Sequence, residues 1–231
     1  MKKVFLLMAV ILPFVFASCG DDRNEPDNPD NHEYVDLGLP HGTLWATCNV
    51  GANTPEEYGY YFAWGETAPK TDFTSITYKW IKGNVGTSGY TKYCTDSLQG
   101  YKGFTDGKIE LESADDAATA NWGAVARMPS LEQFQELVEK CSWQWTQRNG
   151  VYGQLGIGPN GNTIFLPAAG LRSHSSLLEE GSWCLYWSRM LCPDDNYFAY
   201  NMGCNSSNMF WNDHRYRACG IPVRAVRASQ N

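Results

Sequence analysis

Two lysines and an apolar run over residues 4–16 open the chain, and Ala17, Ser18 and Cys19 follow. A basic start, an apolar stretch of about 7–15 residues and small residues before a cleavage point are the layout of a secretory signal. The run is shorter than the about 20 residues that a membrane-spanning helix needs. We therefore predict that residues 1–18 are a signal peptide, so that any fold is built from the residues after it, in an exported and oxidising environment.

Residues 16–19, Phe-Ala-Ser-Cys, resemble the bacterial lipobox, whose cysteine is lipidated and becomes the mature N-terminus. This resemblance implies that Cys19 is a lipid anchor, and several acyl chains attach a protein to a membrane durably. The alternative is ordinary signal-peptide cleavage, which leaves Cys19 unmodified. We expect a protein that is anchored to the outer membrane by its N-terminal lipid.

Residues 19–33 form an acidic tether after the anchor. Their composition shifts to Asp, Asn, Glu and Pro, with no large apolar residue between Gly20 and Glu33, which is typical of a flexible linker. Asp21 and Asp22 resemble the acidic export signals of Bacteroidetes surface lipoproteins, which implies exposure on the cell surface. The alternative is a solvated linker without an export signal.

Removal of the predicted signal peptide changes the net charge and the number of cysteines of the mature chain. The 231 residues become 213, and the net charge changes from −7 to −9 because both lysines of the signal are lost. An acidic chain is a poor partner for nucleic acid, whose phosphates require clustered Lys and Arg. Besides Cys19 an odd number of cysteines remains, so at least one stays unpaired or links to another chain, and the pairing is left open. They are Cys48, Cys94, Cys141, Cys184, Cys192, Cys204 and Cys219.

The pattern from residue 34 onward predicts a single α+β domain over residues 34–231. Two short helices are expected at capping boxes, Ser113 with Asp116 and Ser130 with Gln133. Residues 66–106 lack periodicity and predict a long loop. The expected helices cover residues 117–120 and 131–141, and the expected strands cover residues 34–39, 43–50, 151–157, 163–166, 185–188, 197–202 and 222–226.

Several short segments, in order along the domain, resemble the Fibrobacter succinogenes major paralogous domain family. This resemblance implies a C-type-lectin-like fold, related to that of the formylglycine-generating enzymes, with twisted antiparallel sheets and long loops. The family has no established chemistry, so the resemblance bears on fold and location more than on activity. The matching segments are residues 34–40, 42–52, 59–66, 115–118, 127–130, 165–170, 186–188 and 220–224.

The sequence offers no catalytic motif. Residues 156–161 read Gly-x-Gly-x-x-Gly, but a β-like run follows instead of a helix, and Asn160-Gly161 is a strong hairpin signal. A nucleophile elbow, a zinc-protease helix motif and a P-loop are all missing. In the related formylglycine-generating enzymes catalysis depends on C-terminal cysteines, yet Cys204 and Cys219 lack the surrounding motif. We predict that the protein is not an enzyme.

One triplet and two aromatic residues are candidate binding residues. Sugar-binding C-type lectins carry a Trp-Asn-Asp triplet whose oxygens hold Ca²⁺, and residues 211–213 have this sequence. By this resemblance Asn212 and Asp213, with Asp194 and Asp195 as a loose second pair, are candidate Ca²⁺ ligands; the alternative is a chance match in a turn. Trp80 and Trp211 lie in polar surroundings and are candidate sugar-stacking residues. The other tryptophans in apolar runs are predicted core residues: Trp45, Trp64, Trp122, Trp143 and Trp187.

Three functions remain open. The first is a non-catalytic surface lipoprotein that binds a glycan or a surface protein, as in adhesion. The second is a structural or assembly component of a surface complex, such as a fimbria or a polysaccharide-uptake system. The third is an unrecognised enzyme on the same fold. No cofactor other than Ca²⁺ is suggested.

Overall fold

The computed structural model describes residues 32–83, 86 and 89–229. The predicted signal peptide, the predicted lipid anchor Cys19 and the predicted tether up to residue 31 lie outside the described residues. Within the described ranges no helix is long and apolar enough to cross a membrane.

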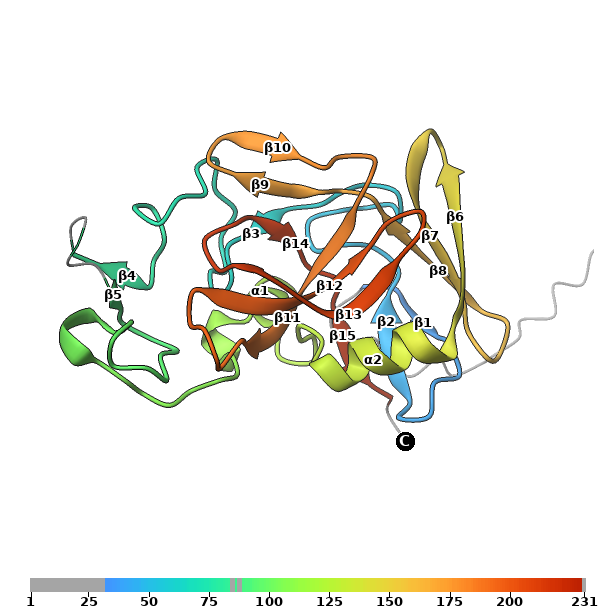
Figure 1. The fold of residues 1–231 in the computed structure, drawn as a ribbon. Helices are drawn as coiled ribbons and strands as arrows, with labels where there is room; N and C mark the ends of the chain where they lie inside the picture. The colour runs from blue at the N-terminus through green and yellow to red at the C-terminus, as the bar shows by residue number, and fades with distance from the viewer. Residues whose placement is uncertain (1–31, 84–85, 87–88, 230–231) are drawn as a thin grey trace, which may run out of the picture.

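The chain is mostly antiparallel β-structure with two short helices, an α+β arrangement as predicted (Figure 1). Two 3₁₀ turns, at Tyr101–Gly103 and Ser113–Asp115, accompany the helices α1 (Ala117–Trp122) and α2 (Leu131–Lys140). The strands are β1 (Tyr34–Asp36), β2 (Thr43–Ala46), β3 (Tyr61–Phe62), β4 (Ile81–Lys82), β5 (Gly89–Tyr90), β6 (Ser142–Arg148), β7 (Val151–Ile157), β8 (Thr163–Pro167), β9 (Leu171–Ser173), β10 (Ser176–Leu178), β11 (Cys184–Leu191), β12 (Phe198–Cys204), β13 (Met209–Tyr216), β14 (Ile221–Pro222) and β15 (Val226–Ala228).

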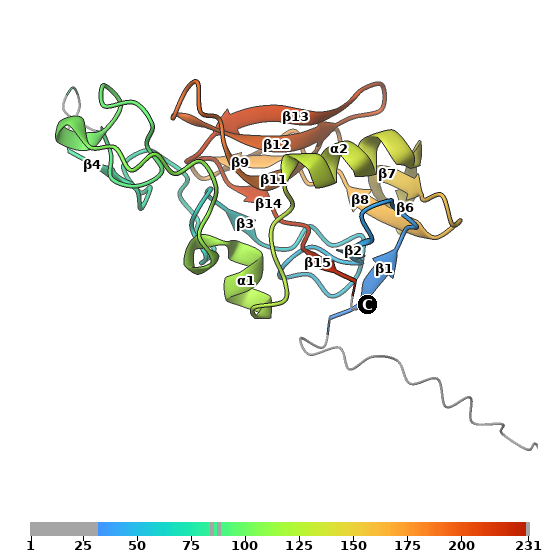
Figure 2. The same ribbon diagram turned by 90° about the horizontal axis from the view of Figure 1, so that it is seen from below.

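The strands form small sheets that are all antiparallel. Three sheets have three strands, in the orders β1-β2-β15, β6-β7-β8 and β11-β12-β13, and β3-β14, β4-β5 and β9-β10 are two-stranded. Because β2 pairs with both β1 and β15, the two ends of the domain share one sheet. In both views the β4–β5 segment lies at one end of the molecule, away from the three larger sheets (Figures 1 and 2).

Helix α2 begins at the predicted capping box. The Ser130 hydroxyl accepts the backbone N–H of Gln133, and the Gln133 side chain accepts the backbone N–H of Ser130. Figure 2 shows the helix lying along the β11-β12-β13 sheet. Phe134 and Leu137 of the helix pack in one cluster with residues of this sheet. We call this the α2-side core; its sheet residues are Cys184, Tyr186, Met202 and Cys204.

A second core cluster lies around Trp64 and Trp187. Their indole N–H groups donate to the carbonyl oxygens of Ser188 and Phe62, at 2.9 and 2.8 Å. Both rings are fully buried, as is Trp45, and Trp122 is also buried, which confirms the prediction for these four. Trp143 was expected in the core but is only half-buried, because it lies on β6 at the edge of its sheet.

The start of α1 differs from the prediction. Its cap is Asp116 and not Ser113, since the Asp116 carboxylate accepts the backbone N–H groups of Thr119 and Met128. Burial raises the pKa of this carboxyl, while its backbone hydrogen bonds act in the opposite direction. Asp116 therefore serves the backbone, as its position before the helix favours.

The last expected strand also differs from the prediction. The strand expected over residues 222–226 is divided into β14 and β15, which pair with different sheets. The three residues between them are fully buried, and the side chain of Arg224 fills the space there.

All seven cysteines in the described part of the chain are thiols. The register of β11 and β12 places Cys184 directly opposite Cys204, and both are completely buried.

Candidate functional site

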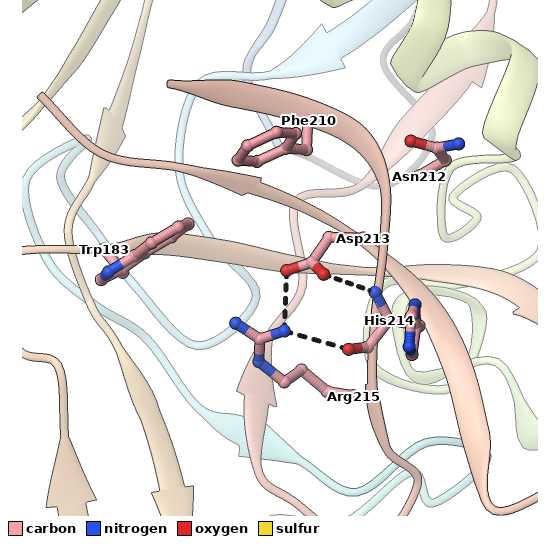
Figure 3. A pocket seen from close by; sticks show the side chains of 6 residues that line it. All are labelled: Trp183, Phe210, Asn212, Asp213, His214 and Arg215. Atoms are coloured by element: carbon pink, nitrogen blue, oxygen red, sulfur yellow. Dashed lines mark hydrogen bonds and ion pairs between the residues drawn. The ribbon is translucent and has the colours of Figure 1, made fainter. Parts of the chain in front are cut away.

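Strand β13 carries the most distinctive surface residues of the domain. Its pairing with β12 contains a bulge, at which Trp211 and Asn212 lie opposite a single residue of β12. A bulge of this kind re-aims the neighbouring side chains. As a result Phe210 and Asp213 point to the same side of the strand, although they are three residues apart (Figure 3).

A hollow of about 310 Å³ lies on this side of β13. Trp183, Phe210, Asp213 and Arg215 gather around it, whereas the side chains of Asn212 and His214 emerge on the other side of the strand (Figure 3). We call this the β13 hollow.

The floor of the β13 hollow is an ion pair with fixed geometry. Arg215 Nη1 lies 2.8 Å from Asp213 Oδ2 and also donates to the carbonyl oxygen of His214, at 3.0 Å. The other carboxylate oxygen of Asp213 accepts the backbone N–H of His214, at 2.9 Å. The side chain of Asp213 remains 21% exposed and that of Arg215 29% exposed, so their unused acceptors and donors can still reach a ligand.

The walls of the β13 hollow are aromatic. Trp183 packs against the cluster of Trp64 and Trp187, and in the described structure its indole N–H donates to no protein acceptor. Phe210 on the opposite wall is 45% exposed. It pairs with Gly203, where a Cβ would come within 3.0 Å of the Asp213 carboxylate, so the glycine makes room for this acid.

Only part of the predicted triplet lies in this site. Trp211 packs against the α2-side core and is half-buried, so its ring is not part of the β13 hollow. Asp213 is in the hollow, but in the middle of a strand, so the expectation that the triplet lies in a turn is wrong.

The four candidate Ca²⁺ ligands are not brought together. Asp194 and Asp195 lie in the β11–β12 connection, where Asp195 accepts from Gln99 Nε2 and the backbone of Tyr197, each at 3.0 Å. Asp213 instead pairs with Asn201, in the middle of β12. Nowhere in the described ranges do three or more His, Cys, Asp or Glu side chains form a group that could hold a metal ion.

Trp80 has little free ring surface. Its indole N–H donates to the carbonyl oxygen of Gly65 at 3.0 Å. Its ring packs against the cluster of Trp64 and Trp187 and against a further buried cluster that contains Tyr78 and Tyr90. The ammonium groups of Lys79 and Lys92 lie 4.2 and 5.1 Å from the ring centroid. These cations occupy the position that a stacked sugar would need.

Asp115 holds both of these lysines. Its carboxylate pairs with Lys79 and Lys92 and accepts the Tyr93 hydroxyl at 2.8 Å. Burial alone would raise the pKa of Asp115, but the hydrogen bonds from Lys92, Tyr93 and Lys79 outweigh it and hold the pKa below its usual value.

A carboxyl whose pKa is lower in the folded state stabilises the fold above its unfolded pKa, and this stability is lost as the pH falls through the folded value. We therefore expect Asp115→Asn to cost stability at pH 7, with the difference from wild type shrinking below about pH 4. Urea unfolding at pH 7 and pH 3 measures this. Asp72→Asn, at an exposed acid without an ion pair in the described structure, is the control. A constant difference at both pH values for Asp115→Asn would contradict the expectation.

Sequence reasoning missed Trp183, Phe210 and Arg215. The sequence of β13, Met-Phe-Trp-Asn-Asp-His-Arg-Tyr, does not alternate apolar and polar residues, so it carried no period-two strand signal that could have indicated Phe210 and Arg215. Trp183 joins them only through the pairing of β11 with β12.

Comparisons of the chain with family models, curated proteins and solved structures found no match. The family named from the sequence and its C-type-lectin-like fold therefore remain predictions.

Proposed function

We propose that this protein is a non-catalytic surface lipoprotein that binds a glycan through the β13 hollow. The observation that carries the proposal is the Asp213–Arg215 ion pair, which lines the same hollow as the rings of Trp183 and Phe210.

A sugar ring has an apolar C–H face and a rim of hydroxyl groups. Aromatic rings such as Trp183 and Phe210 suit the apolar face, because they bury large area against it. A carboxylate only accepts hydrogen bonds and a guanidinium only donates them, so Asp213 and Arg215 together match a hydroxyl pair that must do both. Bonds to charged groups are also stronger than neutral ones. This mode of binding needs no metal ion.

The cellular setting of the proposal comes from the N-terminal sequence. A lipid on Cys19 and an acidic tether would hold the domain away from the outer membrane, in reach of glycans at the cell surface. The small antiparallel sheets and long loops support a C-type-lectin-like fold, which is part of this proposal.

A glycan array, probed with and without a chelator, tests the function. We expect binding that is equal in both arms and at least about tenfold weaker for Asp213→Ala, since a hydrogen bond to a charged group contributes about 1.5–3 kcal/mol. Phe210→Ala is expected to weaken binding too, whereas Tyr152→Ala, at a similarly exposed ring on β7, is the matched control and should bind as wild type does.

Absence of binding in both arms would refute the proposal. Binding that disappears with the chelator would also refute it, because it would indicate a metal-dependent site elsewhere.

A further inference from the structure

A second hollow, of about 260 Å³, lies beside β3 and β9. The residues that matter there are Tyr60, Tyr61, Lys70, Thr71 and Arg172. We call it the Arg172 hollow.

The guanidinium of Arg172 is unlike the other arginine side chains in the described structure. Arg215 pairs with an acid, and Arg217 and Arg224 donate to buried carbonyl oxygens. In the described ranges the Arg172 side chain has neither an ion pair nor a hydrogen-bond acceptor. A half-buried guanidinium with all its N–H groups available is a ready partner for an anion.

The Arg172 guanidinium is held in place by a neighbouring ring and by the paired backbone. Its carbon lies 5.0 Å from the ring centroid of Tyr61, and the Tyr61 hydroxyl is fixed by a 2.6 Å hydrogen bond to the carbonyl oxygen of Ala169. The backbone of Arg172 exchanges hydrogen bonds with Gly220, at 2.7 and 2.8 Å. The cation is therefore placed by a buried ring and a paired strand and not by a loose surface chain.

The second cation of the hollow is already neutralised. Lys70 Nζ lies 2.9 Å from a carboxylate oxygen of Glu66 and also donates to the carbonyl oxygen of Thr77, at 3.1 Å. Arg172 thus supplies the unbalanced positive charge among the residues that line this hollow.

Tyr60 provides a flat wall beside the cation. A Cβ on Gly51 would come within 2.4 Å of the Tyr60 ring, so one face of the ring lies directly on this glycine backbone. The side chain is nevertheless 47% exposed, which leaves its other face to solvent.

We infer that the Arg172 hollow binds a carboxylate-bearing sugar, a hexuronate. The planar fork of Arg172 donates two parallel N–H bonds to the carboxylate, the ring of Tyr60 covers the C–H face of the sugar, and the hydroxyl of Thr71 meets a ring hydroxyl. This inference rests on the proposed glycan-binding function and adds to the β13 hollow a second site, for acidic sugars.

Titration of the ¹⁵N-labelled full chain with glucuronate and with glucose, followed by NMR, tests the inference. The two sugars share a ring and differ in the carboxylate. We expect glucuronate to shift the Arg172 Nε–H signal and to bind at least about tenfold more tightly than glucose. Arg172→Gln should reduce the affinity for glucuronate to that for glucose. Lys70→Gln is the matched control, since its cation is already paired, and should retain the preference.

The indole N–H signal of Trp183 reports the β13 hollow separately. If sugars shift the Trp183 signal but glucuronate never shifts that of Arg172, the acidic-sugar inference fails and the proposed function stands. If neither signal moves with any sugar, both fail. A folded Arg172→Gln variant that still prefers glucuronate would also overturn the inference.

Discussion

Replacing Arg224 with leucine is expected to destabilise the domain by about 3–5 kcal/mol. Arg224 is completely buried and has no acidic partner in the described structure. Its Nε donates to Asn49 Oδ1 at 2.8 Å, and its terminal nitrogens donate to the carbonyl oxygens of Ala46, Thr47 and Phe165, at 2.8 to 3.1 Å. Each buried acceptor left without a donor costs about 1–3 kcal/mol, and four are left here.

These contacts explain why the effect should be large. The side chain of Arg224, between β14 and β15, joins the end of β2 to β8. It adds to the backbone hydrogen bonds that Ala46 and Val50 donate to Ala225 and Val223. Lysine cannot substitute fully, because a single ammonium group cannot reach four acceptors arranged around a planar fork.

Urea unfolding followed by circular dichroism measures the loss. Arg172→Leu is the matched control, since this guanidinium donates to no protein acceptor in the described ranges, and it should cost less than about 1 kcal/mol. If Arg224→Leu does not fold, Arg224→Lys provides the measurement and should lie between the two. Equal stabilities of the Arg224 and Arg172 variants would contradict this account.

Helices and hairpins whose caps or turns are encoded by neighbouring residues were predicted correctly. The capping box of Ser130 and Gln133 and the apolar stripe behind it give α2 within one residue. The hairpin of β7 and β8 follows from Asn160-Gly161, and the first hairpin follows from the break at Pro40. In each case residues close in sequence determine the structure.

Elements that depend on distant partners were missed. Strand β6 has too many polar residues to signal a strand, and it forms by pairing with β7 along its whole length. The division of the last strand depends on the buried Arg224, whose acceptors lie far away in the sequence. The same reason applies to the site: Trp183, Asp213 and Arg215 meet only because two strand pairings bring β11, β12 and β13 together.

The second large effect is expected from Cys184 and Cys204, which should form a disulfide when the chain folds under oxidising conditions. Directly opposed residues of antiparallel strands have Cα atoms about 4.5 or 5.5 Å apart, and both distances are within the about 4.4–6.8 Å of disulfides. Both side chains lie in the α2-side core. Burial and the neighbouring Cys184 raise the pKa of the Cys204 thiol, so oxidation should precede complete burial.

Refolding with and without oxidised glutathione tests this expectation. Two thiols of the chain lose two protons and two electrons, and one glutathione disulfide is reduced to two glutathione molecules. The bond closes a loop from residue 184 to residue 204, which constrains the unfolded chain and should add about 3 kcal/mol to the free energy of unfolding. Mass spectrometry after alkylation identifies the linked pair, and urea unfolding measures the gain.

Cys184→Ser should abolish the gain, whereas Cys141→Ser, at another buried thiol of the same core that has no opposed cysteine, should preserve it. Full alkylation of both Cys184 and Cys204 after oxidative refolding would contradict the prediction, and so would a bond between any other pair. The outcome also bears on the predicted signal peptide, because two opposed cysteines stabilise a strand pair only in a compartment where disulfides persist.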